Sequence, residues 1–123
     1  MTRFKSQGFH NTFRNARKGF RLVLKSEINI RIHIVIAILV LLTAYFLGFT
    51  PLEFCITLFA IAIVIVSEML NTAIEFTLDS VFHNRYSKMV GMAKDISAGA
   101  VMFATFIAVA IGIILFGRYL FIS

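Results

Sequence analysis

The residues with the clearest chemical potential lie at helical spacing within one apolar stretch of the sequence. They are three acids and an amide, separated by three, four and four positions: Glu68, Asn71, Glu75 and Asp79. On a helix these side chains share a narrow stripe of about 80°. An acid near the centre of a membrane span costs about 2.5–3.5 kcal/mol on insertion scales. Acids that share one face at such a cost are typical of a functional site inside a helix bundle.

Other charged residues could join this stripe to form a phosphoryl-transfer site. Glu27 precedes the first long apolar stretch, and we expect it at a depth similar to that of Glu75 if the two helices are antiparallel. Two carboxylates at one depth could share Mg²⁺, a hard cation that binds carboxylate and phosphate oxygens. Lys94 and Asp95 precede the third apolar stretch, where the lysine could meet a phosphate as a point charge. Metal, charge neutralisation and a base are the parts that phosphoryl transfer requires.

A structural role for the same polar residues is the alternative. The acids could form a buried network that holds three helices together, with Arg31 and Lys94 as their partners. Asn29 and His33 lie four positions apart, and this spacing favours interhelical hydrogen bonds over a ligand role. Glu53 lies in the first turn of a predicted helix, where a carboxylate suits the helix dipole. We therefore predict a structural role for Glu53.

The elements that must position these residues are membrane-spanning helices. The chain has 123 residues, of which 59% are hydrophobic and 15% charged, with a mean hydropathy of +0.90. An average soluble domain is about 25% charged, so a soluble fold is disfavoured. Three stretches are long enough to cross about 30 Å of hydrocarbon, at about 30–49, 54–78 and 96–117. With one Pro and seven Gly, the chain is predicted to be all-α, a single membrane-embedded domain over residues 1–123.

Residues 9–25 predict a fourth helix, which lies on the membrane surface. At 100° per residue, the apolar side chains from Phe9 to Leu24 fall within about a third of the circle, opposite the basic side chains. An amphipathic helix with a basic polar face suits the membrane interface. We expect this helix to shape a lipid entrance, to anchor the topology on anionic lipid, or to do both.

The distribution of basic residues predicts the orientation. Lys and Arg outnumber Asp and Glu by 12 to 6. Eight of the twelve lie in residues 1–31 and three in the loop predicted at 80–95, whereas the turn at 48–53 has none. By the positive-inside rule, the N-terminus and the acidic site face the cytoplasm of a multi-pass protein in the cell membrane. The charge suits an anionic membrane surface, and we expect no nucleic-acid partner because the apolar stretches require lipid.

Motifs of other enzyme classes are absent from the sequence. Cys55 is the single cysteine, which excludes an intramolecular disulfide and a cysteine-based zinc site. No P-loop, H-E-x-x-H or G-x-S-x-G motif occurs. Besides an enzyme, the residues leave open a non-catalytic membrane scaffold and a small carrier of cations or protons. The lack of acids in the outer halves of the spans disfavours the carrier.

Several of these segments resemble a known family. The segment Glu68–Asp79, EMLNTAIEFTLD, is similar to the E-x-x-N-[ST]-A-I-E-x-x-x-D signature of the prokaryotic diacylglycerol kinase family. Ala93–Asp95 resembles the A-K-D segment of that family, and Ala16–Gly19 and Glu27–His33 resemble its surface helix and first span. The resemblance extends over residues 9–117. The Glu27–His33 segment looks more like the undecaprenol kinase branch than the diacylglycerol kinase branch.

The resemblance implies an ATP- and Mg²⁺-dependent kinase that acts on a membrane lipid alcohol as a homotrimer with shared sites. Undecaprenol is the expected alcohol, and diacylglycerol is the alternative. Glu68 is implied as the general base toward the lipid hydroxyl, and Glu27 and Glu75 as metal ligands. The nucleotide is implied to contact Glu27, Glu75, Lys94 and Asp95. Asn71 and Asp79 are implied to support the site.

Overall fold

The computed structural model describes residues 8–121, and every regular element in that range is a helix. The four helices are α1 (Phe9–Ser26), α2 (Ile28–Leu47), α3 (Pro51–Phe82) and α4 (Lys88–Phe121). Three of them, α2, α3 and α4, are long and apolar enough to cross a membrane. The predicted all-α chain with three candidate spans is therefore confirmed. The basic residues at positions 3 and 5 lie outside the described range.

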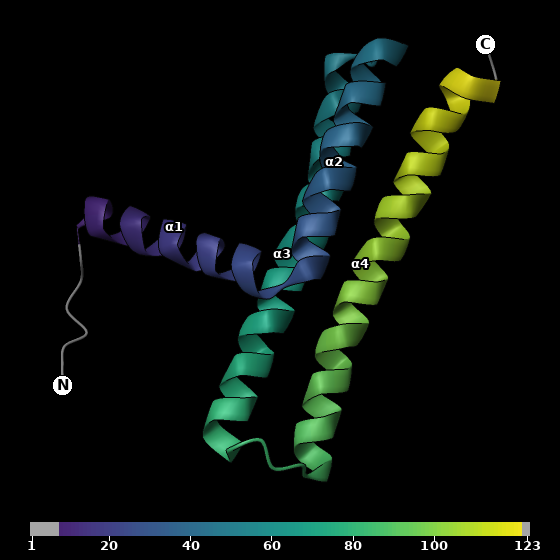
Figure 1. Cartoon of the computed structure of the whole chain (residues 1–123). Coiled ribbons are helices and arrows are strands. Elements are labelled where there is room, and N and C mark those ends of the chain that lie inside the picture. The colour runs from purple at the N-terminus through teal and green to yellow at the C-terminus, as the bar shows by residue number, and fades with distance from the viewer. Residues whose placement is uncertain (1–7, 122–123) are drawn as a thin grey trace.

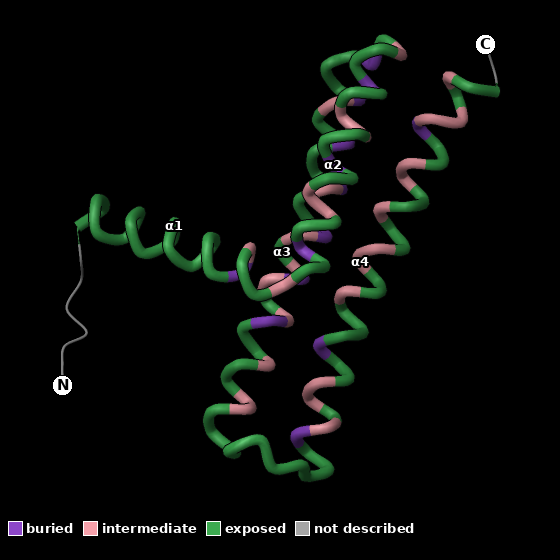
Figure 2. The backbone as a smooth tube through the Cα atoms, viewed as in Figure 1, coloured by how far each residue is buried: buried purple, intermediate pink, exposed green. Residues whose placement is uncertain are grey.

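The three long helices form an elongated body from which α1 projects sideways (Figure 1). α3 and α4 run antiparallel along their whole lengths, whereas α2 packs against only the half of α3 that begins at Pro51. Buried residues lie mainly where the helices face one another, and most of the outer surface is exposed (Figure 2). With 32 residues, α3 is about 48 Å long. It therefore extends well beyond about 30 Å of hydrocarbon.

The corner between α1 and α2 is a single residue, Glu27. Its extended backbone, with φ −122° and ψ 110°, ends α1 and begins α2. Arg31 reaches back from the first turn of α2 and donates hydrogen bonds to the carbonyls of Leu24 and Lys25, at 2.9 and 3.1 Å. The last carbonyls of a helix lack partners within it. The guanidinium therefore stabilises both the end of α1 and the angle at which α2 leaves it.

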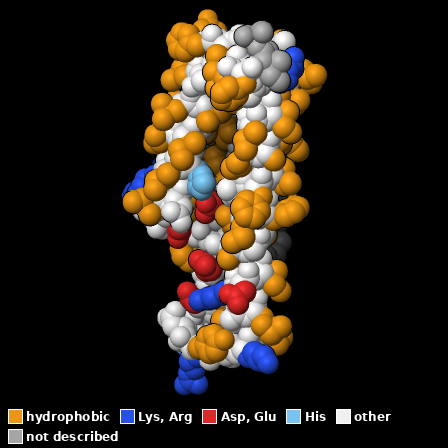
Figure 3. Space-filling model, turned by 90° about the vertical axis from the view of Figure 1, so that its right-hand side faces the viewer, with side chains coloured by type: hydrophobic (Ala, Val, Ile, Leu, Met, Phe, Trp, Pro, Cys, Tyr) orange, Lys and Arg blue, Asp and Glu red, His pale blue; other side chains and the backbone are white. Residues whose placement is uncertain are grey.

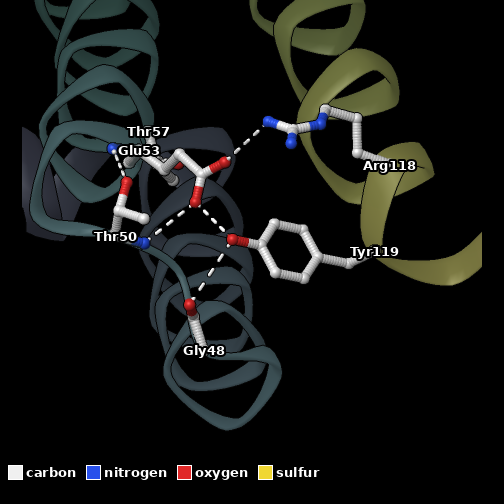
Figure 4. A network of polar contacts seen from close by, with 6 residues as sticks. All are labelled: Gly48, Thr50, Glu53, Thr57, Arg118 and Tyr119. Carbon is white, nitrogen blue, oxygen red and sulfur yellow. Dashed lines mark hydrogen bonds and ion pairs between the residues drawn. The ribbon is translucent and has the colours of Figure 1, made fainter. Parts of the chain in front are cut away.

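The turn between α2 and α3 is tied to the far end of α4 (Figure 4). Gly48 ends α2 in the left-handed conformation, at φ 84°. Thr50 and Glu53 form a capping box, in which each side chain accepts a hydrogen bond from the other residue's backbone N–H. The Glu53 carboxylate also accepts hydrogen bonds from Tyr119 and from Arg118, the latter at 3.2 Å. The structural role predicted for Glu53 is confirmed.

The turn between α3 and α4 is shorter than the loop predicted at 80–95. α3 continues to Phe82 and α4 begins at Lys88. The sequence prediction ended the second span at residue 78 and began the third at residue 96 because charged residues lie between them, but charged residues are compatible with a helix that has left the hydrocarbon. The chain reverses at His83 and Asn84, which both have positive φ, 54° and 63°. Lys94 and Asp95 consequently lie on a helix rather than in a loop.

Candidate active site

Glu68 is buried on α3 and contacts α2. The residue is 8% exposed, and its Oε2 atom lies 2.7 Å from Nε2 of His33. A buried carboxylate is costly without a partner, and His33 supplies one. His33 thus makes an interhelical contact, as its position in the sequence predicts. Its partner is Glu68, the first acid of the stripe.

Two further polar contacts join α3 to α4. The Ser97 hydroxyl donates to Oδ1 of Asn71 at 2.6 Å, and the Lys94 ammonium donates to Oδ1 of Asp79 at 2.8 Å. The second pair is partly exposed, with 37% of the lysine and 40% of the aspartate side chain accessible. The structural alternative predicted that Lys94 pairs with an acid, and it does. The same alternative predicted this for Arg31, which instead binds carbonyls of α1.

Glu27 and Glu75 are both half-buried, and the antiparallel register brings them to similar heights. His33 and Glu68 are level because they touch. Glu27 lies six residues before His33, and Glu75 lies seven after Glu68, which corresponds to about 9 and 10 Å along the helix axes. Within residues 8–121, no three His, Cys, Asp or Glu side chains are grouped closely enough to hold a metal. Two carboxylates nevertheless fit Mg²⁺ bound with a nucleotide, since such sites use one or two carboxylates and phosphate oxygens.

Asp95 stands apart from the other predicted residues. It is exposed on α4, and consecutive residues of a helix point about 100° apart. The neighbouring Lys94 pairs with Asp79 on α3, whereas no hydrogen bond or ion pair within residues 8–121 engages Asp95. The structure thus joins Asn71 and Asp79 of the stripe to α4 and Glu68 to α2, and it leaves Asp95 without a partner among these residues.

The polar residues of α3 lie at different heights along the helix axis. Glu68 lies 17 residues, or about 26 Å, from the start of the helix, and Asp79 lies about 42 Å from it. If α3 enters a hydrocarbon core of about 30 Å at Pro51, Glu68 lies close to the opposite hydrocarbon boundary and Asp79 lies beyond it. Figure 3 shows this order on one face, where a histidine lies above acidic side chains, and a basic side chain lies lower, between two of them. One end of the site is therefore apolar and the other is open to water.

An apolar cavity of about 780 Å³ lies between α2, α3 and α4. It extends from His33 toward the end that carries Phe121, and a hollow between hydrophobic side chains is visible above the histidine in Figure 3. The threonines in its wall bond to their own helices, as Thr43 does to the carbonyl of Leu39. Among residues 8–121, His33 is the only titratable residue that lines the cavity. The cavity therefore suits an apolar chain whose polar end lies beside His33 and Glu68.

Fold and site together define a small helical membrane protein in which a buried acid lies at the end of an apolar cavity and charged residues lie beyond it. The particular family follows from comparison of the sequence. The chain belongs to the prokaryotic diacylglycerol kinase family, whose model matches residues 14–116. The resemblance of the sequence segments is thereby confirmed.

Three curated relatives carry kinase names. A diacylglycerol kinase of Synechocystis sp. is 31% identical over 101 residues, which cover 82% of this chain but 58% of that protein. The undecaprenol kinase of Bacillus subtilis is 31% identical over 108 residues, covering 88% and 87% of the two chains. A diacylglycerol kinase of Haemophilus influenzae is 29% identical over 111 residues, covering 90% of each.

Sequence reasoning missed two features of the site, the pairing of His33 with Glu68 and that of Ser97 with Asn71. A signal for the first was present. If Glu27 is level with Glu75 in antiparallel helices, His33 must lie opposite residue 69, next to Glu68. The signal for Ser97 is weaker, because a serine in an apolar helix commonly bonds to its own backbone.

Proposed function

We propose that this protein is a membrane kinase that transfers the γ-phosphate of ATP to a lipid alcohol. The observation that carries the proposal is the Glu68 carboxylate, which is buried against His33 at the end of the apolar cavity. Membership of the prokaryotic diacylglycerol kinase family supports it. So does the height of the site, since a lipid hydroxyl lies near the hydrocarbon boundary, where Glu68 lies.

Glu68 is the base in this proposal. The lipid chain lies along the cavity and places its hydroxyl at the carboxylate. The hydroxyl oxygen forms a bond to the γ-phosphorus as its proton passes to Glu68, and the bond from that phosphorus to ADP breaks. General-base catalysis of this kind contributes about 10²–10⁴-fold to the rate. Apolar walls on one side of the carboxylate and water on the other also separate the lipid from the nucleotide.

The nucleotide lies on the water side of Glu68. Glu27 and Glu75 would hold Mg²⁺, which neutralises phosphate charge when it is bound. Lys94, held in place by Asp79, meets a phosphate as a point charge, and Asp95 contacts the nucleotide from the margin. Asn71 is fixed by Ser97 and supports the metal ligands. This side faces the cytoplasm, where ATP is found, in agreement with the positive-inside rule.

The active form is a homotrimer in this proposal, with α1 on the membrane surface. Three helices of one chain leave much of the site open, and large apolar side chains cover the outside of the body. A neighbouring subunit would close the site from the side. The mass of the purified protein in detergent, corrected for bound detergent by light scattering, is expected to equal three chains of 13.9 kDa. A monomer that is fully active contradicts the shared site.

Undecaprenol is the lipid that we favour. The segment from Glu27 to His33 is similar to that branch, and the match to the B. subtilis undecaprenol kinase covers 87% of that protein. Diacylglycerol is the second candidate, because two relatives are named diacylglycerol kinase.

The experiment offers both lipids side by side to the purified protein in mixed micelles with γ-³²P-labelled ATP and Mg²⁺. We expect labelled lipid phosphate, formed faster from undecaprenol than from diacylglycerol. A non-catalytic scaffold, the main alternative, predicts no transfer. Failure with both lipids and with related alcohols contradicts the kinase proposal.

A further inference from the structure

We infer that His33 is a positioning residue for Glu68, so that the two side chains work as a carboxylate–imidazole dyad when the lipid hydroxyl loses its proton. The inference rests on the proposed kinase function and adds a second residue to its chemistry. The helix α2 then contributes His33 to the reaction, in addition to Glu27 at the corner that precedes it.

The Glu68 carboxylate is contacted at one of its two oxygens. Nε2 of His33 lies 2.7 Å from Oε2 of Glu68, so the imidazole and the carboxylate are in direct contact. Within residues 8–121, no other hydrogen bond or ion pair engages the Glu68 carboxylate. One oxygen is therefore held, and Oε1 is left to accept the proton of the hydroxyl. A carboxylate fixed at one oxygen keeps the other in a constant direction.

His33 lies next to both Glu68 and the apolar cavity. His33 belongs to the cavity wall, and 30% of its side chain is accessible, compared with 10% for Glu68. A residue that only tied α2 to α3 would gain nothing from facing the cavity. Since the cavity suits the lipid chain, a ligand that enters it meets His33 and Glu68 together.

Within residues 8–121, His33 has no charged partner besides Glu68. Nearby on α2, Arg31 is engaged by the carbonyls of Leu24 and Lys25. On α4, the residues that line the cavity begin at Thr105 and include no titratable group. On α3, Glu68 is the charged residue in contact. The Glu68 carboxylate is therefore the charged group that the His33 imidazole faces.

The dyad accounts for the proton without any further reactant. Nε2 of His33 stays in contact with Oε2 of Glu68 while Oε1 of Glu68 takes the hydroxyl proton, the new oxygen–phosphorus bond forms, and ADP leaves with the electrons of the broken bond. The proton on Glu68 passes to water after the products leave.

The kinetic test compares His33→Leu with His33→Gln. Leucine fills space without a donor, whereas the glutamine amide can still donate to Glu68. Because the polar contact that orients the Glu68 carboxylate is lost, His33→Leu is expected to lower kcat by about 10- to 100-fold. The KM values for ATP and lipid should stay within about threefold, and His33→Gln should recover most of kcat. His10→Leu, on the exposed face of α1, is the matched control and should behave as the wild type.

Two kinetic results would overturn the inference. One is a His33→Leu variant with the wild-type kcat. The other is an equal loss in His33→Leu and His33→Gln, since that pattern reflects packing rather than the polar contact. If the leucine variant fails to fold, the glutamine variant and the spectroscopic test below still decide.

The spectroscopic test does not depend on turnover. The chain has three histidines, at positions 10, 33 and 83, so their ¹⁵N ring resonances can be assigned in labelled protein in micelles. In Glu68→Gln, the Nε2 resonance of His33 is expected to move, whereas those of His10 and His83 stay in place. An unmoved His33 resonance contradicts the dyad.

The failure of this inference is distinguishable from failure of the proposed function. If the wild type phosphorylates no lipid alcohol, both fail, even if the His33 resonance responds to Glu68. If the wild type is active and His33→Leu is equally active, only the positioning role of His33 is lost.

Discussion

At the scale of single residues, the Lys94–Asp79 pair shows how a contact can matter for binding more than for stability. Both side chains are partly accessible, and such pairs contribute little to folding. Their position beyond the hydrocarbon, next to the stripe of acids, instead indicates a role toward the nucleotide. In the proposed function, Asp79 holds the Lys94 ammonium where a phosphate of the nucleotide would meet it.

This assignment predicts a selective defect in nucleotide binding. Lys94→Met is expected to raise the KM for ATP by about tenfold or more, since a charge-assisted contact to phosphate is lost. The KM for the lipid and the thermal stability should change little. Lys18→Met, on the exposed surface of α1, is the control for loss of a positive charge. A KM for ATP that matches the wild type would contradict the assignment.

The candidate site residues could be selected from the sequence, because acids in an apolar stretch are costly and their spacing is visible. The partners of those acids could not. The pairing of His33 with Glu68, which are 35 positions apart in the sequence, depends on the register of two helices, and spacing within one helix carries no information on it. Asp95 illustrates the converse, since its neighbour Lys94 pairs with Asp79 on α3 while Asp95 has no such partner within residues 8–121.

At the scale of elements, Gly48 sets the reversal between α2 and α3. Its φ of 84° is one that residues with a side chain adopt only at a cost of about 1–2 kcal/mol. The contacts of Glu53 with Thr50 and Tyr119 begin just after this turn. The turn therefore determines how the start of α3 meets the end of α4.

Gly48→Ala is accordingly expected to destabilise the protein by about 1–2 kcal/mol, measured by unfolding with SDS in mixed micelles. Apart from the two neighbouring residues, no described heavy atom lies within 4 Å of the added methyl group, so the expected cost is backbone strain. Gly99→Ala is the matched control, because Gly99 lies inside α4 with equally open surroundings and a helical backbone. Equal stability of both variants would refute the role given to this turn.

Hydropathy predicts the three long helices, but it does not predict the residues at which they begin and end. Thr50 and Glu53 form a capping box that sequence spacing can indicate. The ends of α3 and α4 near residues 83–87 were harder to predict, since neither Gly nor Pro marks the turn and the reversal uses His83 and Asn84. Charged residues beyond the hydrocarbon do not mark the end of a helix, because a helix can continue into water.

At the scale of the whole molecule, the two ends of the body differ in character. One end has the Gly48–Glu53 turn and the capped start of α3, and the other has the acidic stripe, Lys94 and the turn at 83–87. The cavity connects them along the apolar interior. We propose that the acidic end faces the cytoplasm.

This orientation predicts opposite labelling of two introduced cysteines. In a Cys55→Ser background, Ser87→Cys reports on the α3–α4 turn and Phe121→Cys on the end of α4, and both sites are exposed. A membrane-impermeant maleimide added to intact cells should label Phe121→Cys only. In inverted membrane vesicles it should label Ser87→Cys only. The reverse pattern would place the acidic site outside the cell and contradict the proposed use of ATP.

The central claim is that Glu68 serves as the base for phosphoryl transfer to a lipid alcohol. The most direct test is the transfer of ³²P from ATP to lipid by Glu68→Gln, measured next to Glu53→Gln in the same micelles. Glu53→Gln preserves the capping box at the opposite end of the body, and its kcat should equal that of the wild type. For Glu68→Gln we predict unchanged helical content and a fall in kcat of about 10²–10⁴-fold. A folded Glu68→Gln variant with activity near that of the wild type would contradict the claim.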